Sequence, residues 1–77
     1  MTASINLSSD EALVLFEWLS ERAASVSPYD ENRRPICAEE FVLNRIHGQL
    51  EKALTEPFDP AYGGLLAAAR QRILASA

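Results

Sequence analysis

All four prolines of this 77-residue chain fall in two short segments, residues 27–36 and 56–60. Proline fixes its own backbone φ angle and lacks the amide hydrogen that the interior of a helix requires. The two segments therefore divide the chain into three stretches, and in each stretch apolar residues recur at a spacing of three or four. This periodicity predicts a small all-α fold with helices at about 10–25, 37–55 and 60–75, in one domain that spans the whole chain.

The first predicted helix has a clear start signal. Ser8 followed three residues later by Glu11 is typical of a capping box, in which each side chain accepts a hydrogen bond from the other residue's backbone amide. Before it, residues 1–8 are expected to form an N-terminal extended arm, in which Ile5 and Leu7 alternate with polar residues. Asp59 and Pro60 give the third helix a similar start, as N-cap and first helical residue.

Each predicted helix has an apolar stripe that we expect to face one common core. The stripes contain Ala12, Leu15, Phe16, Leu19, Ala23 and Val26 in the first helix, Val42, Leu43, Ile46, Leu50, Ala53 and Leu54 in the second, and Tyr62, Leu65, Leu66, Ala69 and Ile73 in the third. The residues of the second helix that we expect to face water are Glu40, Asn44, Glu51 and Thr55. Because the second and third helices are joined by a short connection, they are expected to pack against each other in antiparallel orientation.

Three apolar residues, Val14, Trp18 and Phe41, lie outside these stripes. Small proteins rarely expose a contiguous aromatic patch without a reason. Three explanations stay open: the N-terminal arm folds back over Val14 and Trp18, the residues form a homodimer seam, or they bind a different protein. Trp and Phe are plausible anchors of an interface.

The charge is negative overall and unevenly distributed. The formal net charge is −4, and residues 1–40 carry eight acidic and three basic side chains against three acidic and four basic in residues 41–77. Such a chain is repelled by phosphate groups, so we expect no binding to nucleic acid or to anionic membranes. The acidic half is either a solvated helix face or, with Glu17 and Glu21, a docking face for a basic partner.

The residues that could carry chemistry are few. His47, the only histidine, lies one helical turn before Glu51, and as an alternative the two side chains are candidate metal ligands. A metal site needs three or four ligands, and Cys37 lies ten residues upstream without any cluster to support it. We therefore expect His47 to be a structural residue at the edge of the core. For the chain as a whole we expect no catalytic residue, no cofactor and no enzymatic activity.

The cysteine content and the absence of a recognisable targeting pattern predict the cellular compartment. A single cysteine cannot form an internal disulfide, which small secreted domains normally need. The first ten residues do not resemble a signal peptide, and no apolar run approaches the roughly 20 residues that span a bilayer. The expected location is the cytoplasm.

Two strings of the sequence carry a resemblance: DEALVLFEWL at 10–19 and EPFDPAYGGLLAAAR at 56–70. Together they resemble a small uncharacterised family of bacterial hypothetical proteins. The resemblance covers most of the chain and implies a bacterial cytosolic origin, but it supplies no activity.

The residues themselves favour a non-catalytic protein–protein interaction module of an accessory, antitoxin-like or immunity-like kind. Its partner would be another protein or a second copy of this chain. The residues expected to bind that partner are Val14, Glu17, Trp18, Glu21 and Phe41. The alternative is a helical protein that binds a small molecule or a metal.

Overall fold

The described part of the computed structural model comprises residues 2–25, 27, 29–34 and 36–77. Within it the chain forms three α-helices and a 3-10 turn: α1 (Ser9–Ser25), α2 (Ala38–Ala53), η1 (Glu56–Phe58) and α3 (Tyr62–Ser76). The predicted all-α fold is confirmed. Compared with the predicted ranges, α2 ends two residues earlier and α3 begins two residues later. Val26, assigned to the first apolar stripe, lies outside the described residues.

The helix starts show which local signals the chain uses. The backbone amide of Ser8 donates to Glu11 Oε1 at 2.9 Å, and the amide of Glu11 donates to Ser8 Oγ at 3.1 Å, which confirms the capping box. Asp59 Oδ1 accepts from the amide of Ala61 at 2.7 Å, so this side chain caps the turn that precedes α3. The helix itself therefore begins at Tyr62 rather than at residue 60.

The connection between α1 and α2 contains a closed polar turn. Asp30 Oδ1 accepts from the amides of Asn32 and Arg34 at 2.8 and 2.9 Å, and Arg33 has a φ of 62°, in the left-handed region. Asn44 Nδ2 on α2 donates to the hydroxyl oxygen of Tyr29 at 3.2 Å and so joins this turn to the helix that follows it.

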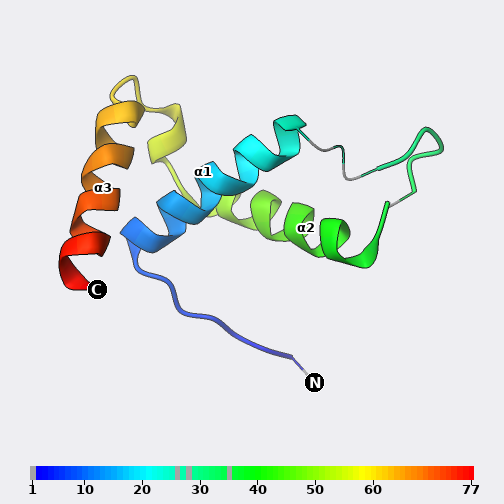
Figure 1. The fold of residues 1–77 in the computed structure, drawn as a ribbon, viewed down its shortest axis with the longest axis horizontal. Helices are drawn as coiled ribbons and strands as arrows, with labels where there is room; N and C mark the ends of the chain where they lie inside the picture. The colour runs from blue at the N-terminus through cyan, green and yellow to red at the C-terminus, as the bar shows by residue number, and fades with distance from the viewer. Residues whose placement is uncertain (1, 26, 28, 35) are drawn as a thin grey trace.

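The first helix is the centre of the fold. It packs against both α2 and α3, whereas α2 and α3 make little contact with each other among the described residues. Figure 1 shows α1 and α2 running side by side in opposite directions, while α3 lies across the N-terminal half of α1. The expected antiparallel packing of the second and third helices is therefore wrong. The segment containing η1 carries the chain past α1, so that α3 docks on another side of that helix.

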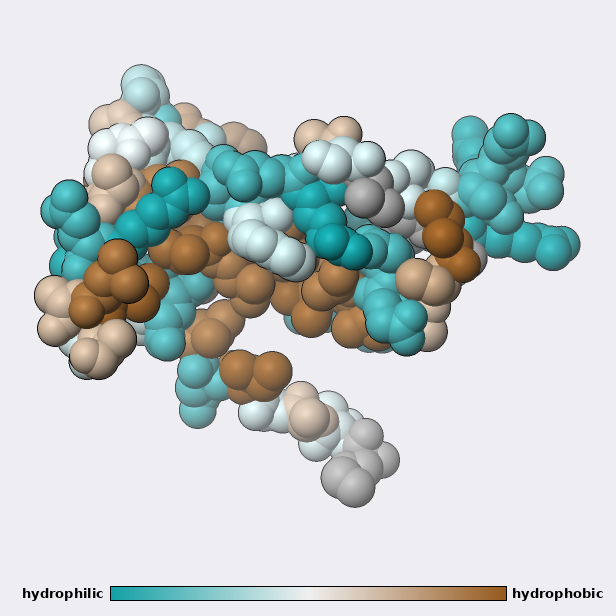
Figure 2. Space-filling model, in the orientation of Figure 1, coloured by the Kyte–Doolittle hydropathy of each residue, from teal (hydrophilic) through white to brown (hydrophobic). Residues whose placement is uncertain are grey.

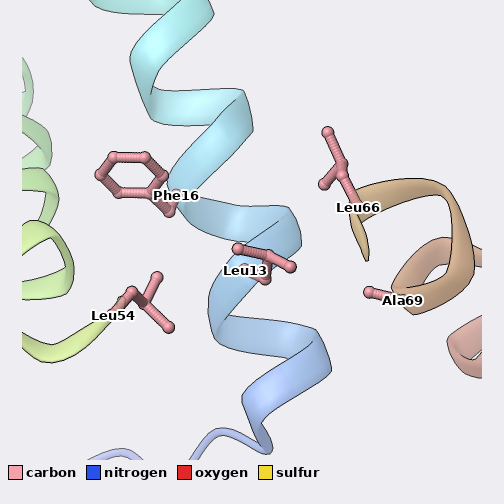
Figure 3. Packing of buried hydrophobic residues seen from close by; sticks show 5 residues of the cluster. All are labelled: Leu13, Phe16, Leu54, Leu66 and Ala69. Atoms are coloured by element: carbon pink, nitrogen blue, oxygen red, sulfur yellow. The ribbon is translucent and has the colours of Figure 1, made fainter. Parts of the chain in front are cut away.

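A small apolar cluster lies where the three helices meet. Its buried members are Leu13, Phe16, Leu54, Leu66 and Ala69. Figure 3 shows Phe16 and Leu54 on the α2 side of α1, and Leu66 and Ala69 on its α3 side. Leu13, only 3% exposed, was not in the predicted stripe. The reason is that α1 is covered on two sides, so its apolar face is wider than one stripe.

The molecule is more open than a closed bundle of this length. Its radius of gyration is 14.0 Å, against about 11–12 Å for a compact domain of 77 residues. Part of the difference comes from the arm, which leads away from the helices in Figure 1 and leaves Ile5 80% exposed. The arm therefore does not cover Trp18. Among the described residues, no helix is long and apolar enough to cross a membrane.

Candidate interaction surface

Trp18 is the most exposed aromatic side chain of the three α-helices, although Phe58 in η1 is more exposed, at 73%. Trp18 lies on α1 and is 51% exposed. The guanidinium carbon of Arg22, one turn further along the same helix, lies 5.6 Å from the centre of the indole ring. At this distance a cation attracts the face of an aromatic ring. Trp18 is thus held against Arg22 while much of its ring remains open to solvent.

Arg22 in turn is fixed by Glu40. Arg22 Nε donates to Glu40 Oε1 at 3.0 Å, and a terminal nitrogen of the same guanidinium donates to the same oxygen. Glu40 is only 8% exposed, so its predicted place on the water face of the second helix is wrong. The carboxylate tolerates burial because the guanidinium lies against it. Hydrogen bonding to Glu40 also raises the pKa of Arg22, which keeps the guanidinium charged.

Glu17 and Glu21 have different surroundings. The hydroxyl of Tyr62 on α3 donates to Glu17 Oε2 at 2.6 Å, so Glu17 connects two helices and is not a free acid on the surface. Burial raises the pKa of Tyr62, and the carboxylate of Glu17 raises it further. Glu21 is exposed and belongs to no ion pair among the described residues. It lines a shallow hollow of α1 together with Trp18, Arg22 and Ser25.

Val14 and Phe41 complete the predicted set. Val14 packs against the core cluster, so the expectation that it lies away from the core is wrong. The approach of α3 to a second side of α1 accounts for this position. Phe41, on α2, is 41% exposed and directly follows Glu40. The structure therefore keeps Trp18, Glu21 and Phe41 as accessible residues, and it assigns Val14 and Glu17 to helix packing.

A second exposed apolar region was not expected from the sequence. Val42, predicted to be in the core, is 52% exposed, and Ile46 on the same helix is only half-buried. A shallow hollow beside them is lined by Ala38, Glu39, Val42 and Leu43. Figure 2 shows apolar side chains gathered in a band below α1 and over α2. Nothing in the sequence distinguishes this stripe from one that a neighbouring helix covers.

His47 has a structural environment. Its Nε2 lies 2.9 Å from Ser20 Oγ, and its ring centre lies 5.0 Å from that of Phe16. The hollow beside it has a volume of about 10 Å³, comparable to the space that one water molecule needs. Glu51 is exposed, and within the described residues no three side chains of the metal-ligating types form a group.

Cys37 is exposed and serves as the N-cap of α2, where its sulfur accepts from the amide of Glu40 at 3.5 Å. That contact gives the thiol a structural role at the helix start. None of these contacts favours the metal or small-molecule alternative.

Comparison of the chain with protein-family models, with curated proteins and with solved structures gave no match. The resemblance to bacterial hypothetical proteins therefore stays a prediction.

Proposed function

We propose that this chain is a non-catalytic protein–protein interaction module of an accessory, antitoxin-like or immunity-like kind. The observation that carries the proposal is the half-exposed indole of Trp18, held against Arg22 on the outer side of α1. Tryptophan is among the residues that contribute most to binding when a partner covers them. A ring already held in place loses little conformational freedom on binding, which favours affinity.

The charge beside Trp18 indicates the kind of partner. Glu21 lies in the same hollow as Trp18, and Glu11 is exposed on the same helix. Acidic side chains around an apolar anchor accelerate encounter with a basic surface and repel acidic ones. We therefore propose that the surface around Trp18 accepts a basic surface. We also propose a cytoplasmic location, because a single cysteine cannot form the internal disulfides that small secreted domains need.

The test is capture of partners from an extract of the source cells with a tagged form of the chain, followed by binding of the purified partner. Trp18→Ala should weaken that binding by about thirtyfold or more. Leu74→Ala is the matched control, because Leu74 is 76% exposed on α3 and far along the chain from Trp18. Equal binding by Trp18→Ala and the parent would contradict the proposed surface. Capture of neither another protein nor a second copy would contradict the proposed function.

A further inference from the structure

The apolar stripe of α2 is only partly covered. Glu40 and His47 bond to residues of α1, and Leu50 packs against the core cluster, which defines the side of α2 that faces α1. Val42 and Ile46 lie beside that side, yet Val42 is half-exposed. No described element covers them completely, because α3 packs on α1 and leaves α2 almost untouched. A further helix would complete the burial of this stripe.

Both helices of the α1–α2 pair carry exposed charges. On α1 these are the acids Glu11 and Glu21, and on α2 they are the bases Arg45 and Lys52 and the acids Glu39 and Glu51. The ion pairs among the described residues are Arg22–Glu40 and Asp10–Arg72, so none of these six side chains is committed to one. The two bases of α2 therefore complement in charge the two acids of α1.

The spacing of these charges also matches. Within the chain, Ser20 lies opposite His47 and Arg22 lies opposite Glu40, as expected for antiparallel helices. In a dimer with a two-fold axis parallel to the helices, α2 of the second copy would lie beside α1 of the first copy. It would run antiparallel to that α1, at the same height along the axis as the α2 of the first copy. Arg45 of the second copy would then lie at the level of Glu21. Two turns further along, its Lys52 would approach the level of Glu11.

We infer that a second copy of this chain docks on the α1–α2 pair, so that α1 of each copy lies antiparallel to α2 of the other. The inference rests on the proposed function, since it names a second copy as a partner of this interaction module, bound through the face that carries Glu21, Val42 and Ile46. Val42 and Ile46 form the apolar centre of this four-helix arrangement, and Glu21 pairs with Arg45 at both edges. The apolar burial supplies the affinity, whereas exposed ion pairs mainly set orientation. A chain this short buries only about 60% of its unfolded surface alone, which favours self-association.

The first test is the mass in solution, measured by analytical ultracentrifugation over a range of concentrations. The parent should form a species of twice 8.5 kDa. Val42→Asp should weaken the dimer by at least about tenfold, because it places a carboxylate in an apolar interface. Leu74→Asp, the same kind of change at an exposed site on α3, should leave the dimer intact. Circular dichroism checks that both variants keep their helices.

Charge reversal tests the orientation. Glu21→Arg and Arg45→Glu should each weaken the dimer, and the variant carrying both changes should restore it. The two residues form no ion pair within the described part of the chain, so rescue requires pairing between copies. Failure of the double variant to recover would overturn the inference.

A parent that stays monomeric at every concentration would also overturn the inference. If that monomer still bound a different protein through Trp18, the proposed function would stand without it. A monomer that bound no protein at all would remove both proposals.

Discussion

At the scale of single residues, polar side chains of α1 determine how the other two helices dock. Arg22 binds Glu40 on α2, while Glu17 and Asp10 bind Tyr62 and Arg72 on α3. The Asp10–Arg72 pair is bidentate, with distances of 2.8 and 2.7 Å, a geometry that favours one relative orientation. The hydrogen bonds from Arg72 lower the pKa of Asp10 below 3.8, so its carboxylate stays ionised to a lower pH than an unpaired aspartate.

Tyr62→Phe removes the hydroxyl that binds Glu17 and should lower the free energy of unfolding by about 1 kcal/mol, since the contact is partly solvated. The native pKa of Tyr62 is raised above 10.0, so the folded state holds the proton more tightly than the unfolded state. The stabilisation that the Tyr62 hydroxyl contributes is therefore complete below pH 10.0 and is lost as the pH rises above that value.

Urea unfolding at about pH 8 and about pH 10.5 measures this effect. The difference between parent and Tyr62→Phe should shrink at the higher pH. A difference that stays constant would show that Tyr62 does not titrate in this way.

At the scale of elements, each helix is specified locally but placed by distant contacts. The capping box of α1 involves residues three apart, and the sequence alone predicted it. Glu40 shows the opposite case. Its partner Arg22 is eighteen residues away, and no local pattern connects the two, so the sequence placed Glu40 on the water face.

Ser8→Ala should destabilise α1 by about 1 kcal/mol, because the amide of Glu11 loses its acceptor. The hydrogen bonds from Ser8 lower the pKa of Glu11 below 4.5. The stabilisation is therefore present above that pH and is lost as the pH falls below it, and Ser8→Ala should reduce this acid dependence. Thermal unfolding followed by circular dichroism at about pH 7 and about pH 3 measures both effects. Ser9→Ala, one residue further along, is the control and should behave as the parent does.

The same contrast explains which parts of the candidate surface could be predicted. The sequence singled out Trp18 because it falls outside the periodic stripe of its own helix, a property of the local sequence, but it did not decide whether the arm covers that side chain. Leu13 and Val14 were misplaced because their burial depends on α3, more than forty residues further along. Val42 was misplaced for the converse reason, since the helix expected to cover it packs elsewhere. Periodicity shows that a face is apolar, but it does not show which element buries it.

At the scale of the whole molecule, the core is a single small cluster where the three helices meet. Such a domain has a free energy of unfolding of roughly 4–12 kcal/mol. In this cluster, Leu13 and Phe16 of α1 lie between Leu54, which directly follows α2, and two residues of α3. These two residues are Leu66 and Ala69. The loss of one central side chain should therefore affect the entire fold and not only one helix.

Leu13→Ala tests this dependence. Removal of a leucine side chain that is 3% exposed should cost about 2–5 kcal/mol, a large share of the total stability. Leu74→Ala, at an exposed site, should change it by no more than about 0.5 kcal/mol. Urea unfolding followed by circular dichroism compares the two. Equal effects of the two variants would contradict the central role of Leu13.

The helix α1 lies between two helices that barely touch each other. This arrangement determines how well each helix tolerates substitutions. A substitution on the inner side of α2 or α3 can be compensated by a change in α1 alone. A substitution on the inner side of α1 has to suit two separate neighbours at once. In a saturation mutagenesis of this chain, α1 should therefore accept the fewest replacements. The other two helices should be open to redesign one at a time, each without regard to the sequence of the other.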